Sequence, residues 1–340
     1  MRIGLLTGGG DCPGLNAAIR AVVKQGLGEY GHQIIGFRNG WKGVVDGDVI
    51  QLDRSNIRNI LPQGGTMLGT ARFHPHSAGA MEQVMATLEA ERIDALICIG
   101  GDGTLNAASK VAEQGINIVA IPKTIDNDVY GTDLSIGYHT AVNIATEAID
   151  RIHTTAESHN RVMVIEVMGR HAGWIAVASG IAGGAEIVLA PEEPFEIEKI
   201  VKFLKHRHRA HANFSIVVVA EGAAPAKGSA MDYEVQLGQY GEIIAGAIGE
   251  RVAKEIQERT GFDTRLTVLG HVQRGGTPTP TDRILGSRFG VAAIDAISAG
   301  KTNVMTAVRN EEIVLVPLEE IAGKVKTVPD DLLSVAKALA

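Results

Sequence analysis

The stretch IDALICIGGDGT, residues 93–104, decides the fold because it joins an apolar run directly to a glycine-rich loop. Residues 95–99 read as a buried strand, and the glycines that follow let the backbone turn sharply and approach a ligand closely. In α/β proteins, ligands bind where the carboxyl ends of parallel strands meet such loops. The stretch therefore predicts a parallel-sheet protein with a binding site at residues 100–104.

Similar apolar runs recur along the chain and alternate with helical patterns. Alternating strands and helices favour parallel sheets with right-handed crossovers, so the expected fold class is α/β. The predicted strands cover residues 1–6, 33–37, 95–99, 116–121, 162–168, 187–190 and 215–220, and the clearest predicted helices cover residues 16–27 and 139–153.

The composition bounds the class of protein. A chain of 340 residues is long enough for two domains, and 45% apolar residues with only 4% aromatic residues predict aliphatic cores. We expect Trp41 and Trp174 to be half-buried packing residues rather than ligand platforms. The net charge of −7 argues against a nucleic-acid or membrane surface, so the expected partner is a small molecule.

The two cysteines and the apolar runs indicate the compartment. Cys12 and Cys98 are far apart in sequence and form no Cys-x-x-Cys pair, which fits a reducing cytoplasm. The apolar residues before the first glycines are too few for a signal peptide, and no later run reaches the length of a membrane span. We therefore expect a soluble, cytoplasmic protein.

Two segments carry the residue types that a phosphoryl transfer requires. In residues 100–104 the backbone N–H groups of the glycines can approach phosphate oxygens, and Asp102 can hold the magnesium that neutralises them. In residues 122–128, PKTIDND, Asp126 and Asp128 are carboxylates that can accept the proton of an attacking hydroxyl.

Residues 8–14, GGGDCPG, follow a predicted strand and open a predicted helix, an arrangement that favours anion binding at the helix N-terminus. The spacing is not the Gly-x-Gly-x-x-Gly fingerprint, so a nicotinamide dinucleotide is not expected. The alternative is a tight turn without a ligand.

Three further loops place an arginine among glycines. Arg72 ends the loop at residues 64–72, Arg170 lies within residues 168–173, and Arg274 lies within residues 269–276. Arginine pairs with phosphate through two hydrogen bonds, and the recurrence favours a ligand with several phosphates. For Arg72 alone, a surface ion pair is the alternative.

With these motifs in view, the sequence resembles the 6-phosphofructokinase family, bacterial type, over essentially its whole length. Five motifs occur in the family order, at residues 9–16, 100–104, 124–128, 168–173 and 270–276. The resemblance implies two Rossmann-like domains with mainly parallel sheets, the second inserted in the first. It places the domain for ATP and Mg2+ at residues 1–137 and 273–323, and the fructose 6-phosphate domain at residues 138–272 and 324–340.

The resemblance also assigns roles to single residues. Asp126 resembles the base that takes the proton of the sugar 1-hydroxyl, with Asp128 assisting, and Arg170 the residue that stabilises the transferring phosphoryl group. Asp102 resembles the magnesium ligand. The donor would be bound by Gly10, Arg72, Phe73, Gly101, Asp102, Gly103 and Thr104. The sugar phosphate would be bound by Thr124, Asp126, Arg161, Met168, Gly169, Arg170, Glu221, Arg265, His271 and Arg274.

In the family, the counterparts of Arg161 and Arg265 arrive from a neighbouring subunit. The resemblance therefore implies a homodimer or homotetramer with shared active sites. It also implies the glycolytic reaction in which ATP phosphorylates fructose 6-phosphate to fructose 1,6-bisphosphate.

Gly103 and Lys123 give opposite indications about the phosphoryl donor. Pyrophosphate-using members tend to carry Asp at the position of Gly103, where it repels the ATP α-phosphate, and Lys at the position of Lys123. The combination in this chain resembles the mixed-substrate subgroup. We favour ATP because the absent carboxylate permits it outright, whereas a lysine near phosphates suits either donor.

Three alternatives stay open. The first is a reversible, pyrophosphate-dependent phosphofructokinase, which Lys123 favours. The second is a catalytically silent sugar-phosphate sensor, although Asp102 and Asp126 are both present. The third is an NAD or lipid kinase, in which the arginine-rich motif at residues 270–276 is not expected.

The allosteric site of bacterial ATP enzymes is matched only in part. Arg20, Lys24, Arg54 and Glu186 occupy positions that resemble it, whereas His153, Ala210 and Ala212 replace basic residues. We therefore do not expect nucleotide or phosphoenolpyruvate control of the usual kind.

Overall fold

The computed structural model describes residues 1–73, 75, 79–231, 233–238, 243–321 and 323–339. Its internal contacts divide the chain into two compact units. Unit 1 comprises residues 1–140 and 274–326, and unit 2 comprises residues 141–273 and 327–340. Most of unit 2 is thus inserted between two parts of unit 1, the arrangement that the family resemblance implies.

Unit 1 is built on a seven-stranded sheet within the described residues, in the order β11-β10-β5-β4-β1-β2-β3. The five inner strands run parallel, and the edge strands β3 and β11 are antiparallel to their neighbours. The strands are β1 (Arg2–Thr7), β2 (Gln33–Phe37), β3 (Val49–Leu52), β4 (Ala95–Gly100), β5 (Ile118–Pro122), β10 (Val304–Arg309) and β11 (Glu312–Pro317).

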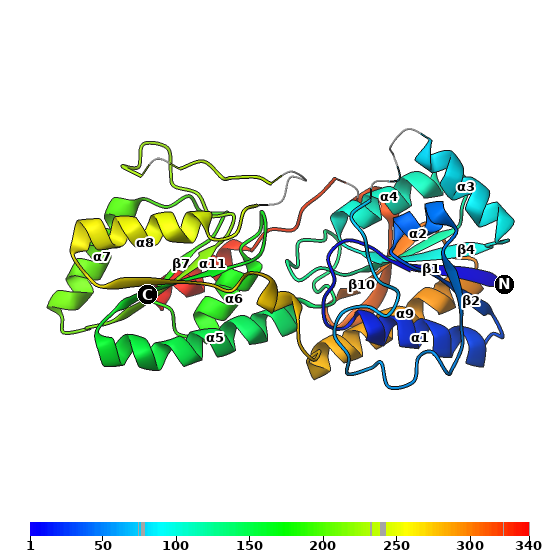
Figure 1. Ribbon diagram of the computed structural model, residues 1–340, viewed down its shortest axis with the longest axis horizontal. Coiled ribbons are helices and arrows are strands. Elements are labelled where there is room, and N and C mark those ends of the chain that lie inside the picture. Colours follow the sequence, from blue (N-terminus) through cyan, green and yellow to red (C-terminus); the bar gives the residue numbers. More distant parts are fainter. Residues whose placement is uncertain (74, 76–78, 232, 239–242, 322, 340) are drawn as a thin grey trace. The chain divides into compact units, whose positions relative to one another are not determined.

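Helices cover both faces of this sheet (Figure 1). One face carries α1 (Leu15–Gly28) and α9 (Pro280–Ser298), and the other carries α2 (Trp41–Asp46), α3 (Ala80–Ala90) and α4 (Asp102–Ala112). A short helix, α10 (Leu318–Ile321), follows β11. Because both faces are covered, β1, β4 and β5 are buried along almost their whole length, which explains their continuous apolar sequences.

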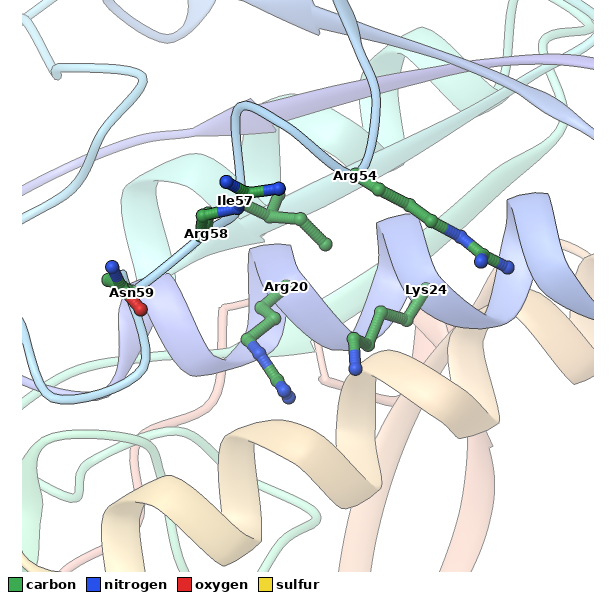
Figure 2. A pocket seen from close by; sticks show the side chains of 6 residues that line it. All are labelled: Arg20, Lys24, Arg54, Ile57, Arg58 and Asn59. Atoms are coloured by element: carbon green, nitrogen blue, oxygen red, sulfur yellow. The ribbon is translucent and has the colours of Figure 1, made fainter.

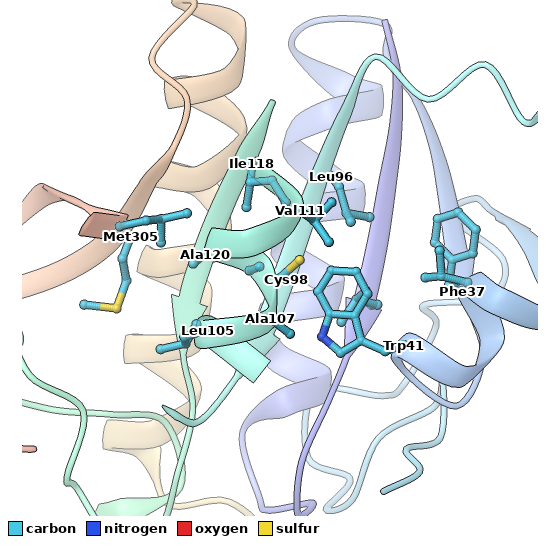
Figure 3. Close-up of a cluster of buried hydrophobic side chains, with 14 of the residues drawn as sticks. Phe37, Trp41, Leu96, Cys98, Leu105, Ala107, Val111, Ile118, Ala120 and Met305 are labelled. Carbon is cyan, nitrogen blue, oxygen red and sulfur yellow. The ribbon is translucent and has the colours of Figure 1, made fainter. Parts of the chain in front are cut away.

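Figure 3 shows the core between the sheet and α2, α3 and α4, with Phe37, Leu96 and Cys98 on the strands. Trp41 lies in this cluster at 3% exposure. The expectation of a half-buried Trp41 was therefore wrong, because α3 and α4 complete the core around its ring. Trp174 is half-buried, as expected.

The pairing of α1 with α9 depends on two glycines of α9. A Cβ on Gly286 would lie 2.9 Å from the carbonyl oxygen of Gly14, and one on Gly290 would lie 2.7 Å from that of Ala18. The two helix backbones therefore approach closely only because these positions carry no side chain. This contact fixes the start of α1, which directly follows the first glycine-rich loop.

Unit 2 contains a four-stranded parallel sheet in the order β7-β8-β6-β9 among the residues described. Helices α7 and α8 lie over one face, and α5 and α6 lie over the other (Figure 1). The strands are β6 (Val162–Val167), β7 (Ile187–Leu189), β8 (Ser215–Ala220) and β9 (Thr264–Val268). The helices are α5 (Tyr138–His159), α6 (Trp174–Ala182), α7 (Ile197–Arg209), α8 (Ala247–Thr260) and α11 (Asp330–Ala338), with a 3-10 helix, η1, at Gly270–Arg274.

In the part of the chain that the structure covers, no helix combines the length and the apolar character needed to cross a bilayer.

Candidate active site

In unit 1, two glycine-rich loops lie at the carboxyl ends of β1 and β4: the first loop (residues 8–14) and the second loop (residues 100–104). The Thr104 side chain packs between them and is 5% exposed. A Cβ on Gly8 would lie 2.5 Å from Thr104 Oγ1, and one on Gly100 would lie 2.3 Å from Thr104 Cβ. Both positions therefore require glycine, and Thr104 fixes the spacing of the loops.

The second loop leads into α4, whose first turn contains Asp102 and Gly103, both exposed. Asp102 Oδ1 accepts a hydrogen bond from Asn106 Nδ2 at 3.0 Å, which orients the carboxylate. A Cβ on Gly103 would meet no atom within 4 Å. This helix N-terminus therefore presents its backbone dipole and one carboxylate to open space.

The acidic loop (residues 122–128) follows β5, the neighbour of β4 in the sheet. Its Asp126 is 3% exposed, and the Asp126 N–H donates to Thr124 Oγ1 at 3.2 Å. Asn127, with a φ of 52°, accepts a hydrogen bond from the Ser135 N–H at 3.0 Å. These contacts fix the loop, so that a buried carboxylate lies just beyond the end of a central strand.

Asp128 is half-buried, and its backbone carbonyl accepts a hydrogen bond from the Lys326 N–H at 2.8 Å. Lys326 Nζ donates to the carbonyls of Thr132 and Asp133 at 2.9 and 2.8 Å. Burial lowers the pKa of Lys326 to about 8. Lys326 could not be predicted as part of this loop, because nothing in its local sequence pattern relates it to residues some 200 positions earlier.

Other residues predicted to bind the donor also lie in unit 1. Arg72 is exposed, and Phe73 packs against the core shown in Figure 3. The loop before Arg72 is held by Asn16, whose side chain donates to the carbonyls of Gln63 and Gly64 at 3.2 Å each. Gly10 is exposed, and Gly101 is half-buried at the start of α4.

Arg274 lies beside the first loop, with Nη1 directed at the Asp11 carbonyl at 3.4 Å. A Cβ on Gly10 would lie 2.0 Å from the same nitrogen. The absence of a side chain at Gly10 therefore allows the guanidinium to approach. In the first loop, burial raises the pKa of the Cys12 thiol to about 12, which makes it an inert packing group.

In unit 2, the arginine loop (residues 168–173) follows β6, and Met168 at its start is 9% exposed. Glu221, 3% exposed, accepts hydrogen bonds from the N–H groups of Gly169 and Arg170 at 3.3 and 2.9 Å. Gly169 has a φ of 148°, and a Cβ there would lie 2.6 Å from the Ala172 carbonyl. The loop thus has one defined conformation in which the exposed Arg170 follows a buried turn.

Arg161 and Arg265, on neighbouring strand ends, share the carboxylate of Asp263. Arg161 Nε donates to Asp263 Oδ2 at 2.6 Å, and Arg265 Nη1 lies 2.5 Å from Oδ1. The hydrogen bond from Arg161 lowers the pKa of Asp263 below its usual value. Sequence reasoning missed Asp263, although an acidic residue two positions before Arg265 was an available signal. His271, in η1, is exposed.

A separate cavity of about 430 Å³ in unit 1 is lined by Arg20, Lys24, Arg54, Ile57, Arg58 and Asn59 (Figure 2). Arg20 and Lys24 lie on α1, and Arg54 extends over the same helix (Figure 2). Three of the four residues noted for the allosteric resemblance thus line or border one hollow. The fourth, Glu186, lies in unit 2, where it pairs with Arg207 at 2.6 Å.

Comparisons with known proteins bear on this arrangement. The profile of the family described as phosphofructokinase matches residues 2–297. The chain is 51% identical over 332 residues to an ATP-dependent 6-phosphofructokinase of Mycobacterium tuberculosis, covering 97% of this chain and 96% of the relative. It is also 51% identical over 330 residues to a pyrophosphate–fructose 6-phosphate 1-phosphotransferase of Streptomyces coelicolor, covering 96% of each.

Among solved structures, that of Pichia pastoris phosphofructokinase in the T-state has a TM-score of 0.84 and 33% sequence identity. The match covers 99% of this chain and 36% of the Pichia chain, so this protein spans about a third of that longer relative. The family match therefore covers residues 2–297, and the shared fold covers 99% of the chain. The protein belongs to the phosphofructokinase family.

Proposed function

We propose that this protein transfers the γ-phosphoryl group of ATP to the 1-hydroxyl of fructose 6-phosphate, giving fructose 1,6-bisphosphate and ADP. The two relatives described above differ in donor at the same identity, so the donor must be argued from the chain itself. The observation that carries the choice is the open space at Gly103. With no side chain there, no charge opposes the α-phosphate of a nucleotide.

The donor side of the proposed site is unit 1. Glycine backbones of the two loops and the N-terminus of α4 provide N–H groups for phosphate oxygens, and Arg72 adds a positive charge at the end of its loop. Phe73, packed against the core, anchors that loop. We assign Gly10, Gly101, Gly103 and Thr104 to the same donor-binding surface.

Asp102 fits the requirements of a magnesium ion. Mg2+ in phosphoryl-transfer sites is bound by one or two carboxylates together with substrate phosphates, and Asp102 offers an exposed, oriented carboxylate at a helix N-terminus. Among the described residues there is no cluster of three or more His, Cys, Asp or Glu side chains that could hold a metal without phosphate. Bound there, the ion would neutralise the donor phosphates.

The acceptor chemistry falls to Asp126. Its carboxylate would take the proton of the 1-hydroxyl as the oxygen bonds to phosphorus and the bond to the ADP oxygen breaks. Asp128 lies two residues further along and adds negative charge beside the base. Arg170 would stabilise the charge on the transferring phosphoryl group.

The proposed sugar-phosphate contacts come from both units: Thr124 and Arg274 belong to unit 1, and the other residues belong to unit 2. Thr124, Met168, Gly169 and Glu221 would bind the sugar, and His271 and Arg274 its 6-phosphate. Arg161 and Arg265 would reach the 6-phosphate of a neighbouring subunit, so the working enzyme would be a homodimer or homotetramer. We place the reaction in glycolysis, in the cytoplasm.

A steady-state assay tests the function. We expect fructose 6-phosphate to be phosphorylated with a higher kcat/KM for ATP than for pyrophosphate, and 31P spectra to show fructose 1,6-bisphosphate. A higher kcat/KM for pyrophosphate would favour the reversible alternative, for which Lys123 is the evidence. Sugar-phosphate binding without turnover would favour the silent sensor.

A further inference from the structure

Lys123 joins the two glycine-rich loops through two different groups. Its backbone N–H donates to the Gly100 carbonyl at 2.9 Å, at the start of the second loop. Its side-chain ammonium donates to the Gly10 carbonyl in the first loop. The residue is 2% exposed, so the ammonium is removed from bulk water and depends on protein oxygens for its hydrogen bonds.

The first loop is held at three consecutive carbonyls by three side chains. Thr70 Oγ1 donates to the Gly9 carbonyl at 2.6 Å, Lys123 donates to that of Gly10, and Arg274 lies 3.4 Å from that of Asp11. The Lys123 ammonium also lies close to Gly9, the preceding residue of the loop, since a Cβ on Gly9 would be 3.5 Å from Nζ.

A fixed carbonyl determines where the next N–H points. In a trans peptide, the carbonyl of one residue and the N–H of the following residue point in opposite directions. The bond from Thr70 to Gly9 therefore directs the Gly10 N–H away from Thr70, and the bond from Lys123 to Gly10 directs the Asp11 N–H away from the ammonium. These are N–H groups of the loop that we assign to the donor phosphates.

We propose that Lys123 is a positioning residue that orients the first loop for donor binding. This inference rests on the proposed function, in which that loop receives the donor. Lys123 then acts through the peptide groups of residues 10 and 11. Because those groups meet phosphate in either donor, Lys123 supports ATP and pyrophosphate alike. On this inference Lys123 no longer favours pyrophosphate, and Gly103 alone decides between the two donors.

The test is Lys123→Met, which keeps the length and apolar stem of the side chain and removes its N–H donors. We expect KM for ATP to rise about 10-fold to 100-fold and kcat to change less than about 3-fold. The Ki of pyrophosphate, measured as a competitor of ATP, should rise by the same factor as KM. A weakening confined to pyrophosphate, or a loss of kcat at unchanged KM, would overturn the inference.

Thr70→Val provides an independent test at the neighbouring carbonyl. We expect it to raise KM for ATP and Ki for pyrophosphate together, by less than Lys123→Met. In the double variant the two effects should be less than multiplicative, because both bonds orient the same loop. Independent, fully multiplicative effects would contradict a shared action.

Two controls distinguish a failure of the positioning role of Lys123 from a failure of the proposed function. Lys110→Met, on the exposed surface of α4, removes an equal charge away from the loop and should leave both constants unchanged. If the unsubstituted enzyme phosphorylates fructose 6-phosphate from ATP but Lys123→Met has normal constants and a normal melting curve, only the positioning role fails. If the unsubstituted enzyme uses neither donor, the proposed function itself fails.

Discussion

The carboxylate of Glu221 accepts a hydrogen bond from the backbone N–H of Arg170, with an oxygen–nitrogen distance of 2.9 Å. The same oxygen accepts the Gly169 N–H at 3.3 Å, and a Cβ on Gly222 would lie 1.9 Å from the Arg170 carbonyl. Arg170 has a φ of 51°, a left-handed backbone conformation that residues other than glycine rarely adopt. Glu221 and Gly222 therefore hold the arginine loop in a conformation it would not keep alone.

Replacing Glu221 tests this arrangement. Glu221→Leu removes the acceptor of the Gly169 and Arg170 N–H groups, and a buried donor left without an acceptor costs roughly 1–3 kcal/mol. We expect kcat/KM for fructose 6-phosphate to fall about 100-fold or more, measured at saturating ATP. Glu221→Gln keeps an acceptor oxygen, so its kcat/KM for fructose 6-phosphate should fall less than that of Glu221→Leu. Equal losses in the two variants would argue against a role through the Arg170 backbone.

Lys326 predicts a pH dependence of stability. Burial lowers its pKa from 10.5 to about 8, so between pH 8 and 10.5 the unfolded chain binds more protons at this residue than the folded chain. Stability contributed by this group must then rise with pH, by at most about 1.4 kcal/mol per pH unit. The difference in melting temperature between the unsubstituted protein and Lys326→Met should become more positive from pH 7.5 to pH 10. A constant difference would show that the pKa is not lowered.

Asp126→Asn keeps the size of the side chain and removes the proposed base. We expect kcat to fall by a factor on the order of 10² to 10⁴, with little change in the affinity for fructose 6-phosphate. The measurement is kcat with saturating substrates, together with equilibrium binding of fructose 6-phosphate. A near-normal kcat would remove Asp126 from the mechanism.

Hybrid oligomers test the sharing of active sites. If Arg161 and Arg265 act in a neighbour's site, a mixture of inactive Arg265→Ala and inactive Asp126→Asn subunits should regain activity, because some sites then contain neither lesion. Hybrid assembly is verified by native mass spectrometry. Confirmed hybrids without recovered activity would indicate that each site is built from a single chain.

Much of the fold could be predicted from continuous apolar runs. Strands β1, β4, β5, β6 and β8 are buried on both faces, so their sequences carry an unbroken signal. The predicted helix at residues 139–153 was too short, since α5 continues to His159. Its last turns are polar at all positions but Ala156, which is fully buried, and one apolar residue is too weak a signal to extend a helix.

The edges of the large sheet were not predicted. Strand β3 has four residues, three of them partly or fully exposed, and most of β11 is half-buried or exposed. Both are antiparallel edge strands without the apolar continuity of the centre. Strand β10, next to β11, was also not predicted: it is buried at four of its six positions, and two of its residues pair with β5.

The glycine-rich and acidic loops could be predicted as a site from their order along the chain, whereas their contacts could not. The bond from Lys123 to Gly10 spans 113 residues, and that from Arg161 to Asp263 spans 102. Such pairs depend on the sheet order, which no local pattern specifies. The catalytic and binding roles of the individual residues stay predictions.

The most direct measurement of the central claim, that ATP is accepted because position 103 carries no charge, compares Gly103→Asp with Gly103→Asn. A side chain at this position meets no neighbouring atom at its Cβ, so both variants should fold normally. The two differ in charge and hardly in size, so a difference between them isolates the repulsion between a carboxylate at this position and the α-phosphate. We predict that kcat/KM for ATP is at least about 100-fold lower in Gly103→Asp than in Gly103→Asn. Equal use of ATP by the two variants would contradict the account.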